Sequence, residues 1–317
     1  MSESSLPLPP QPHFGLSSEA AALIVLVFGA ATIGFAPILV RLTETGPAAA
    51  GFWRLLFALP ALAIMDVAVR RRDPQSANGL GIGLVAGLLF AGDLAFWHYG
   101  VAMTSVANAT VLSNLSPIVV AVMAWILFRD RPRPAFAMGV VMGIAGACGM
   151  ALFADSEPGQ SNFAGDAFAA ATALWYGLYL LAVNVGRRTL PASTIMLYST
   201  AAGAPILLSI ALALGERVIP LTPAGWAACI GLGVVHVLGQ GAIAWALGRL
   251  SAPLASVCIL VQPVVAAVAG AAIFSEMLNP AQIVSGVFAL AGICVARIAS
   301  APRRNIVSET QPIPVTG

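Results

Sequence analysis

The feature that most constrains this chain is a series of apolar stretches, each about 20 residues or longer, that follow one another along nearly its whole length. An α-helix of that length rises 1.5 Å per residue and crosses the roughly 30 Å hydrocarbon core of a bilayer. Only 9% of the 317 residues are charged, against roughly 25% in an average soluble domain. The pattern therefore predicts an all-α membrane protein that crosses the bilayer repeatedly.

Ten ranges are long and apolar enough to span. We expect transmembrane helices at 20–41, 47–69, 79–101, 105–128, 135–154, 163–186, 191–214, 222–248, 252–274 and 280–299. The two ends of the chain are polar and rich in proline, which is typical of segments that do not pack. We therefore expect disordered tails at 1–19 and 300–317.

The arginines divide between the two sides of this layout. All fifteen basic residues are arginine, and with ten spans alternate loops share a side. One side collects Arg70, Arg71, Arg72, Arg129, Arg131, Arg133, Arg187, Arg188, Arg249, Arg297, Arg303 and Arg304. The other side has Arg41 and Arg217, and Arg54 lies within a span. Because positive loops stay inside, we expect the first side and both termini to be cytoplasmic.

The chain also contains an internal repeat. The matching pairs are Trp97 and Trp245, Gly100 and Gly248, Pro117 and Pro263, Asp130 and Glu276, Pro134 and Pro280, and Gly146 and Gly292. The repeat unit has five helices, so the halves 20–154 and 155–299 must have opposite orientations in the membrane. Inverted repeats are a common build of secondary transporters, whose solute site lies near the midplane between the halves.

The duplicated proline–acid–proline signature, the five-plus-five layout and Arg54 in the second helix resemble the EamA branch of the drug/metabolite transporter superfamily. The resemblance covers about residues 20–299. It implies a ten-helix carrier with a central cavity, in a family whose members export amino acids and other metabolites or exchange nucleotide sugars and sugar phosphates. The aromatic and histidine content of 79–101 and 163–186 resembles a subgroup that exports aromatic and other amino acids from bacteria, which implies the bacterial inner membrane.

Two charges lie deep within predicted spans. Arg54 is about seven residues from one end of 47–69, and Asp93 is about eight residues from the end of 79–101 on the same side, so both sit ~10–12 Å deep. A charge at a helix centre costs at least about 2.5–3.5 kcal/mol. Two interpretations stay open: an ion pair that joins the two helices, or a carboxylate or proton site in a cavity.

Other candidates are aromatic, histidine and amide side chains inside the spans. Aromatic rings can contact an ammonium group, and histidine can relay protons near neutral pH. The candidate substrate-binding residues are Trp175, Tyr176, Tyr179, His98, Tyr99, Asn114, His236, Gln240 and Gln262. For each, packing or an interhelical hydrogen bond is the alternative role. Pro117 and Pro263 free a backbone carbonyl one turn back and are candidate hinges.

Several classes of site have no support in the sequence. No HExxH or similar spacing predicts a metal site, and the four cysteines lie far apart in apolar runs. The absence of lysine removes the phosphate-loop motif and Schiff-base chemistry. No basic patch interleaved with aromatics predicts binding to nucleic acid. We expect no cofactor, no metal and no nucleic-acid partner.

The sequence thus predicts a secondary exporter of small metabolites, with amino acids, aromatic ones included, as the expected solutes, working by alternating access as a monomer or homodimer in membrane lipid. A proton-coupled exporter of drugs or cationic compounds is the first alternative. An intramembrane enzyme is a more distant one, because no nucleophile and base stand at a recognisable spacing.

Overall fold

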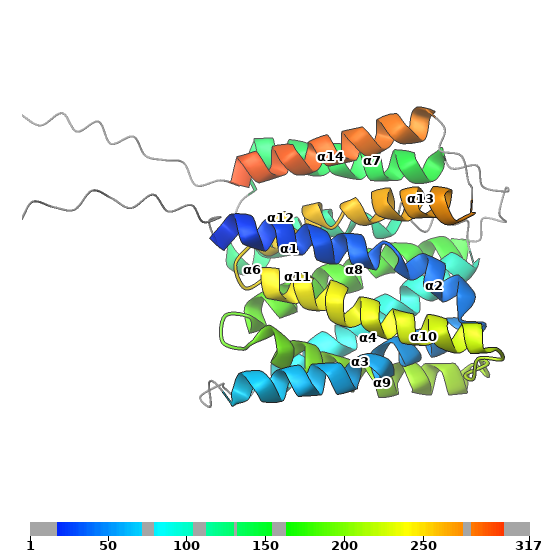
Figure 1. Ribbon diagram of the computed structural model, residues 1–317. Coiled ribbons are helices and arrows are strands. Elements are labelled where there is room, and N and C mark those ends of the chain that lie inside the picture. Colours follow the sequence, from blue (N-terminus) through cyan, green and yellow to red (C-terminus); the bar gives the residue numbers. More distant parts are fainter. Residues whose placement is uncertain are drawn as a thin grey trace, which may run out of the picture.

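The computed structural model describes residues 18–71, 79–103, 112–129, 132–153, 163–274 and 280–300, and every regular element within these ranges is helical (Figure 1). The expected tails therefore lie almost wholly outside the described residues, as do Asp130 and Glu276 of the duplicated signature. The helices run roughly along one direction and form a single bundle (Figure 1).

The helices follow the predicted ranges closely. They are α1 (Ser18–Ile33), α2 (Ala36–Leu42), α3 (Pro47–Arg70), α4 (Leu80–Met103), α6 (Ser116–Phe128), α7 (Pro134–Leu152), α8 (Phe163–Gly186), α9 (Ala192–Ala213), α10 (Pro223–Val235), the π-helical η1 (His236–Gln240), α11 (Gly241–Ala246), α12 (Ala252–Cys258), α13 (Val261–Phe274) and α14 (Pro280–Ser300). Seven described helical segments are long and apolar enough to cross a membrane, and three further described helices are apolar but shorter. The chain is a multi-pass membrane protein.

Two of the expected continuous helices are broken, and the described part of a third contains a turn. A break at Gly34 separates α1 from α2, and Ile259 and Leu260 separate α12 from α13. The described part of 105–128 has a turn before α6 begins at Ser116. A proline follows each interruption within three residues, and its ring removes a backbone donor that a continuous helix would need.

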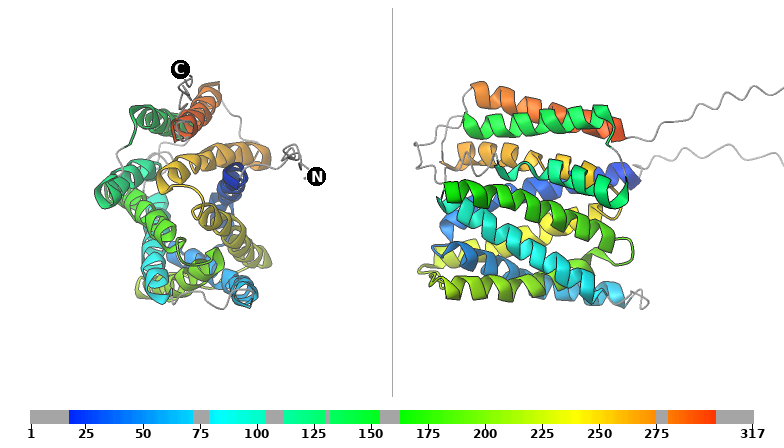
Figure 2. Two further views of the ribbon diagram at one scale, coloured as in Figure 1. Left: turned by 90° about the vertical axis from the view of Figure 1, so that its left-hand side faces the viewer. Right: turned by 180° about the vertical axis from the view of Figure 1, so that it is seen from behind.

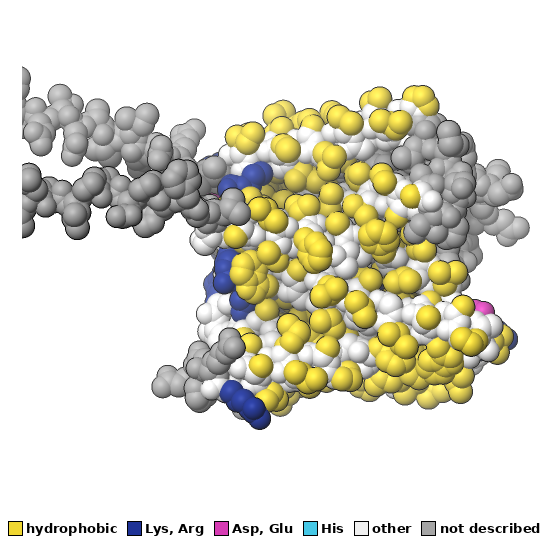
Figure 3. Space-filling model, viewed as in Figure 1, with side chains coloured by type: hydrophobic (Ala, Val, Ile, Leu, Met, Phe, Trp, Pro, Cys, Tyr) yellow, Lys and Arg dark blue, Asp and Glu magenta, His cyan; other side chains and the backbone are white. Residues whose placement is uncertain are grey.

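Seen end-on, most of the helices form a ring, and α7 and α14 lie side by side outside it (Figure 2). Within the ring α3 packs against α9 and α10, α4 packs against α8 and α9, and α1 packs against η1 and α11. The flank of the bundle seen in Figure 3 is covered by hydrophobic side chains, as a lipid-facing surface requires.

Basic side chains gather at one end of the bundle (Figure 3), the end where α1 begins and α14 ends. Arg297 forms an ion pair with Glu19 at 3.0 Å, and Arg133 donates a hydrogen bond to the carbonyl of Ala299 at 2.9 Å. Of the described arginines, this end has Arg70, Arg71, Arg129, Arg133, Arg187, Arg188, Arg249 and Arg297, and the opposite end has Arg41 and Arg217.

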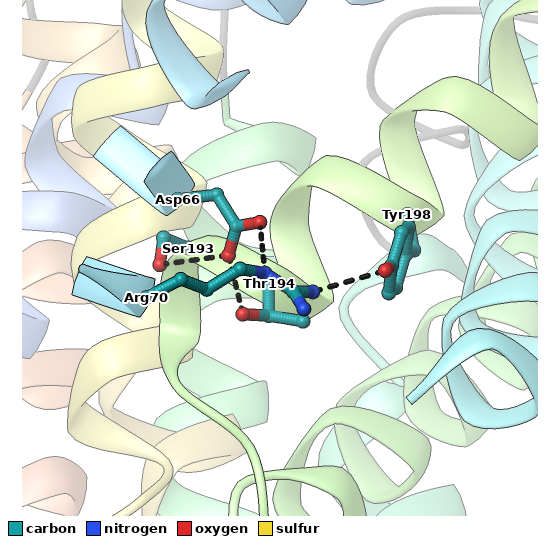
Figure 4. A network of polar contacts seen from close by, with 5 residues as sticks. All are labelled: Asp66, Arg70, Ser193, Thr194 and Tyr198. Atoms are coloured by element: carbon teal, nitrogen blue, oxygen red, sulfur yellow. Dashed lines mark hydrogen bonds and ion pairs between the residues drawn. The ribbon is translucent and has the colours of Figure 1, made fainter. Parts of the chain in front are cut away.

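A polar network joins α3 to the beginning of α9 at the arginine-rich end (Figure 4). The buried carboxylate of Asp66 accepts hydrogen bonds from the hydroxyls of Thr194 and, at 3.5 Å, Ser193. It also pairs with Arg70 at 2.7 Å, and Arg70 donates to the Tyr198 hydroxyl at 2.9 Å. The negative charge of Asp66 thus lies at the N-terminus of α9, where the helix dipole favours an anion.

A second carboxylate lies at the opposite end of this helix pair. Glu216, just after α9, accepts hydrogen bonds from the backbone N–H groups of Ala48 at 3.2 Å and Ala49 at 2.9 Å, in the first turn of α3. The Tyr99 hydroxyl also donates to Glu216. Each helix of the antiparallel α3–α9 pair therefore has a carboxylate from the far end of the other at its N-terminus. Glu216 caps backbone N–H groups of α3, whereas Asp66 bonds the hydroxyls of Ser193 and Thr194.

Glycine allows α7 and α14 to touch backbone to backbone. A Cβ added to Gly146 would lie 2.6 Å from the Ser285 carbonyl oxygen of α14, and one added to Gly139 would lie 2.8 Å from the Gly292 carbonyl oxygen. A Cβ on Gly292 would meet the backbone of Gly143. Small residues at helix contacts are the usual means of close packing inside membranes.

This packing predicts the effect of single methyl groups. We expect Gly146→Ala to lower the free energy of unfolding by about 1–3 kcal/mol, because the added carbon overpacks a backbone contact. Gly81→Ala on α4 is the matched control, because no described atom lies within 4 Å of its Cβ position, and alanine should gain up to about 1 kcal/mol there. Thermal unfolding in detergent measures both; equal midpoints would contradict the close contact.

Candidate functional site

A cavity of about 160 Å³ lies inside the ring of helices. A single water needs roughly 10–15 Å³ on this measure, so the cavity has room for a small organic solute. The lining residues are Ile33, Gly34, Ala36, Pro37, Arg54, Phe90, Asp93, Leu94, Trp97, Ser113, Asn114, Ser116, Thr172, Tyr176, Gln240, Ile259, Leu260, Gln262, Pro263 and Ala266.

The cavity is located where helices are interrupted. The break at Gly34, the turn that begins at Asn114 and the break at Ile259 and Leu260 all contribute to its wall. The π-helical segment η1 ends there at Gln240. An interrupted helix leaves backbone groups without their usual partners, and such backbone is tolerated at membrane depth only beside protein or a wet cavity.

Two opposite charges face this cavity from neighbouring helices. Arg54 of α3 is 4% exposed and Asp93 of α4 is 8% exposed. Each is close enough for its charge to act on the other, yet the ion pairs found among the described residues are elsewhere, so Arg54 and Asp93 do not pair directly. Arg54 lies 5.8 Å from the centre of the Phe90 ring. The two charges flank the cavity without neutralising each other by contact.

Five polar atoms at the cavity have no partner at hydrogen-bonding geometry in the described part of the chain. They are Arg54 Nε, Asn114 Nδ2, Tyr176 Oη, Gln240 Oε1 and Gln262 Nε2. Tyr176 and Gln262 lie close enough to interact with each other. Most buried polar groups in proteins are hydrogen-bonded, so an unpaired one calls for an explanation. A cluster of them around one space is what a site for a polar ligand or for ordered water would contain.

The aromatic candidates of α8 separate into one lining residue and two packing residues. Tyr176 lines the cavity, whereas Trp175 and Tyr179 do not. A Cβ on Gly92 would meet the indole of Trp175, so this ring fills the space beside that glycine. The Tyr179 ring lies 4.7 Å from that of Phe90, and its hydroxyl contacts Met196 Sδ at 3.7 Å.

The two histidines and Tyr99 lie outside the cavity lining. His98 is buried, with Nδ1 at 2.5 Å from the Leu94 carbonyl oxygen of its own helix. His236 is buried with Nε2 at 2.9 Å from Thr200 Oγ1. Tyr99 donates to Glu216 at the end of the bundle. In this conformation these side chains have structural contacts, and their role with a substrate remains a prediction.

Of the two candidate hinges, Pro263 lines the cavity and Pro117 is buried in the first turn of α6.

Sequence reasoning did not identify Trp97 and Thr172 as lining residues. Helical spacing could have found both, because Trp97 follows Asp93 by four residues and Thr172 precedes Tyr176 by four, which places each pair on one face. Among the described residues no group of three His, Cys, Asp or Glu side chains could hold a metal ion.

Both halves of the chain match one protein-family model, described as the EamA-like transporter family, over residues 20–152 and again over 163–298. A solved structure titled only "Crystal structure of protein" has a TM-score of 0.72 and 19% sequence identity, and the match covers 90% of this chain and 100% of that chain. At this identity the likeness shows the fold alone. No curated protein has a matching sequence.

The unpaired polar atoms predict an unusual response to mutation. We expect Gln240→Met to leave the free energy of unfolding unchanged or raise it by up to about 1 kcal/mol, because the unpaired Oε1 contributes nothing to folding. The control is Asn184→Leu, because Asn184 Nδ2 donates to the carbonyls of Leu247 at 2.7 Å and Leu250 at 3.2 Å.

That control should lose about 1–3 kcal/mol. Unfolding in detergent, followed by the fluorescence of the tryptophans, compares the two variants. A Gln240→Met protein as destabilised as Asn184→Leu would mean that Gln240 has a structural bond after all.

Proposed function

Because the chain belongs to the EamA-like transporter family, we propose that it is a secondary transporter that exports small metabolites, namely amino acids with aromatic ones included, by alternating access. The match to both halves confirms the resemblance to the EamA branch, whose members are membrane transporters of small molecules. The solute, the mechanism and the direction of transport belong to the proposal.

The proposal that the solutes are amino acids is supported by the mixture of charged, polar and aromatic groups that line the cavity. It combines one cation, one anion, several amide groups and aromatic rings, among them Trp97, Phe90 and Tyr176. A sugar phosphate or nucleotide sugar would call for several basic clamps, and Arg54 is the one basic residue of this lining. Amino acids present both charges, and many present an apolar side chain.

Alternating access is supported by the way the helices pair. If the ten expected spans form two inverted halves, α3 corresponds to α9, α7 to α14, α4 to α10–α11 and α8 to α1. The contacts of α4 with α8 and α9 then have counterparts in those of α10–α11 with α1 and of α10 with α3. Equivalent packing in two opposed halves allows the same rocking motion toward either side of the membrane.

We also propose that all ten segments span the membrane, with both termini in the cytoplasm of a bacterial inner membrane. Eight described arginines at the end of the bundle with Ser18 and Ser300, against two at the other, support this orientation by the positive-inside rule.

The alternative is a proton-coupled exporter of drugs or cationic compounds. Asp93 supports it, because a buried carboxylate in a cavity can bind a cation or a proton. Arg54 is evidence against this alternative. A cationic solute that has no carboxylate would occupy the same cavity as the positive guanidinium of Arg54 and could not neutralise it.

Counterflow tests the function directly. Liposomes containing the purified protein and preloaded with unlabelled phenylalanine should take up labelled phenylalanine faster than protein-free liposomes. A panel of other amino acids and of lipophilic cations is run in parallel. Uptake of cations alone would favour the alternative, and folded protein that exchanges none of these solutes would overturn the amino-acid proposal.

Two tyrosines one helical turn apart provide a matched pair of variants. We expect Tyr176→Phe to reduce counterflow about threefold to tenfold, because it removes a hydroxyl that faces the cavity without a partner at hydrogen-bonding geometry. Tyr179→Phe should keep near-wild-type counterflow, because its hydroxyl contacts only Met196 among the described residues. Equal losses in both variants would contradict the assignment of the site to this face of α8.

A further inference from the structure

We propose that Arg54 and Asp93 together bind the head group of a free zwitterion, with the substrate carboxylate at Arg54 and its ammonium group at Asp93. This inference rests on the proposed function, because it names the atoms by which the same cavity would recognise an amino acid. It makes the charge pattern of the solute, rather than its side chain, the primary requirement for binding.

The first argument is that the two charges share one cavity without forming an ion pair. Arg54 extends from α3 and Asp93 from α4, and both line the same space. Their charges act on each other, but no direct contact joins them. An ion pair built only for stability would bring the two groups together, because separated charges in a low-dielectric interior gain less from their attraction.

The second argument is the match between the charges and the ligand. A zwitterion is neutral overall, so its entry adds no net charge to the membrane interior. Its carboxylate can accept hydrogen bonds from a guanidinium in a planar, two-point arrangement. Its ammonium group can donate to a carboxylate. One ligand therefore satisfies both protein charges, whereas a simple cation or anion would satisfy one and repel the other.

The third argument is the chemistry of the remaining wall. Gln262 Nε2 and Asn114 Nδ2 are donors, and Gln240 Oε1 is an acceptor, without a partner at hydrogen-bonding geometry in the described part of the chain. They supply further hydrogen bonds to a ligand with oxygen and nitrogen at one end. Phe90 and Trp97 provide apolar surface in the same space, which suits an apolar or aromatic side chain.

The fourth argument is where these groups lie in the chain. Arg54 and Asp93 belong to the half matched over residues 20–152, whereas Gln240 and Gln262 belong to the half matched over 163–298. A ligand held by both sets would connect the two halves. Binding of the head group would then bias the relative position of the halves, as a carrier requires.

The experiment uses ligands that share one side chain and differ in the head group. Phenylalanine, phenethylamine and 3-phenylpropionate are zwitterion, cation and anion respectively. Binding to the purified protein in detergent is measured by calorimetry, and counterflow is measured in liposomes. We expect wild-type protein to bind phenylalanine at least tenfold more tightly than either single-charge analogue. This comparison of three ligands uses wild-type protein only, so its result does not depend on whether a variant folds.

Variants then assign each charge to its end of the ligand. Arg54→Gln and Asp93→Asn should each weaken phenylalanine binding at least tenfold. The ratio of phenethylamine to 3-phenylpropionate affinity should rise in Arg54→Gln and fall in Asp93→Asn. Gly81→Ala should keep wild-type values in every assay, because its Cβ position meets no described atom and lies outside the cavity lining. Thermal unfolding establishes that each variant is folded.

The outcomes separate this inference from the proposed function. Phenylalanine counterflow that both charge variants retain at the wild-type level would overturn the zwitterion site and leave amino-acid transport standing. Charge-dependent phenylalanine binding without counterflow would support the site and overturn the transport proposal. If wild-type protein binds phenethylamine as tightly as phenylalanine, the zwitterion site is overturned and the cavity is a binding site for cations.

Discussion

A lipid bilayer offers no hydrogen bonds to a polypeptide backbone, and this constraint organises the structure. Where a helix is interrupted, the freed N–H and C=O groups must face protein or water. The break at Gly34, the turn before α6 and the break at Ile259 and Leu260 all meet at one cavity. The interrupted helices are therefore located where a polar space can tolerate them.

The same reasoning extends to the side chains. Arg54 and Asp93 would each cost at least about 2.5–3.5 kcal/mol at the centre of a spanning helix. Both are found at the cavity, where water or a ligand can solvate them. The charged groups at the ends of the α3–α9 pair are satisfied by contrast, because Asp66 and Glu216 accept several hydrogen bonds each. The molecule thus keeps its paired charges at the rim and its unpaired charges in the middle.

The sequence indicated the helices more completely than the residues that line the cavity, for one physical reason. Length and hydropathy alone locate a spanning helix, but a helix that is apolar all round does not reveal which face meets its neighbours. Trp175 and Tyr176 are adjacent on α8, yet only Tyr176 reaches the cavity, because Trp175 fills the space beside Gly92. A proline in the sequence was similarly ambiguous as a sign of a helix break. The helix α13 begins two residues before Pro263, whereas α3 and α9 continue through Pro60 and Pro205. Rare charged and amide residues, such as Asp93 and Gln262, did indicate the cavity, because burying such groups in a membrane costs free energy unless they have a function or a partner.

The glycine contacts between α7 and α14 have a consequence for the history of the sequence. Gly139 and Gly146 each face a backbone segment of α14, and Gly292 faces the backbone of Gly143. A side chain can grow at any of these positions only if the opposing backbone moves away, because every residue type has the backbone atoms that it would meet. In homologous chains, Gly139, Gly146 and Gly292 should therefore be kept together or replaced together, and this pair of helices should carry a covariation signal of its own, separate from any imposed by the solute.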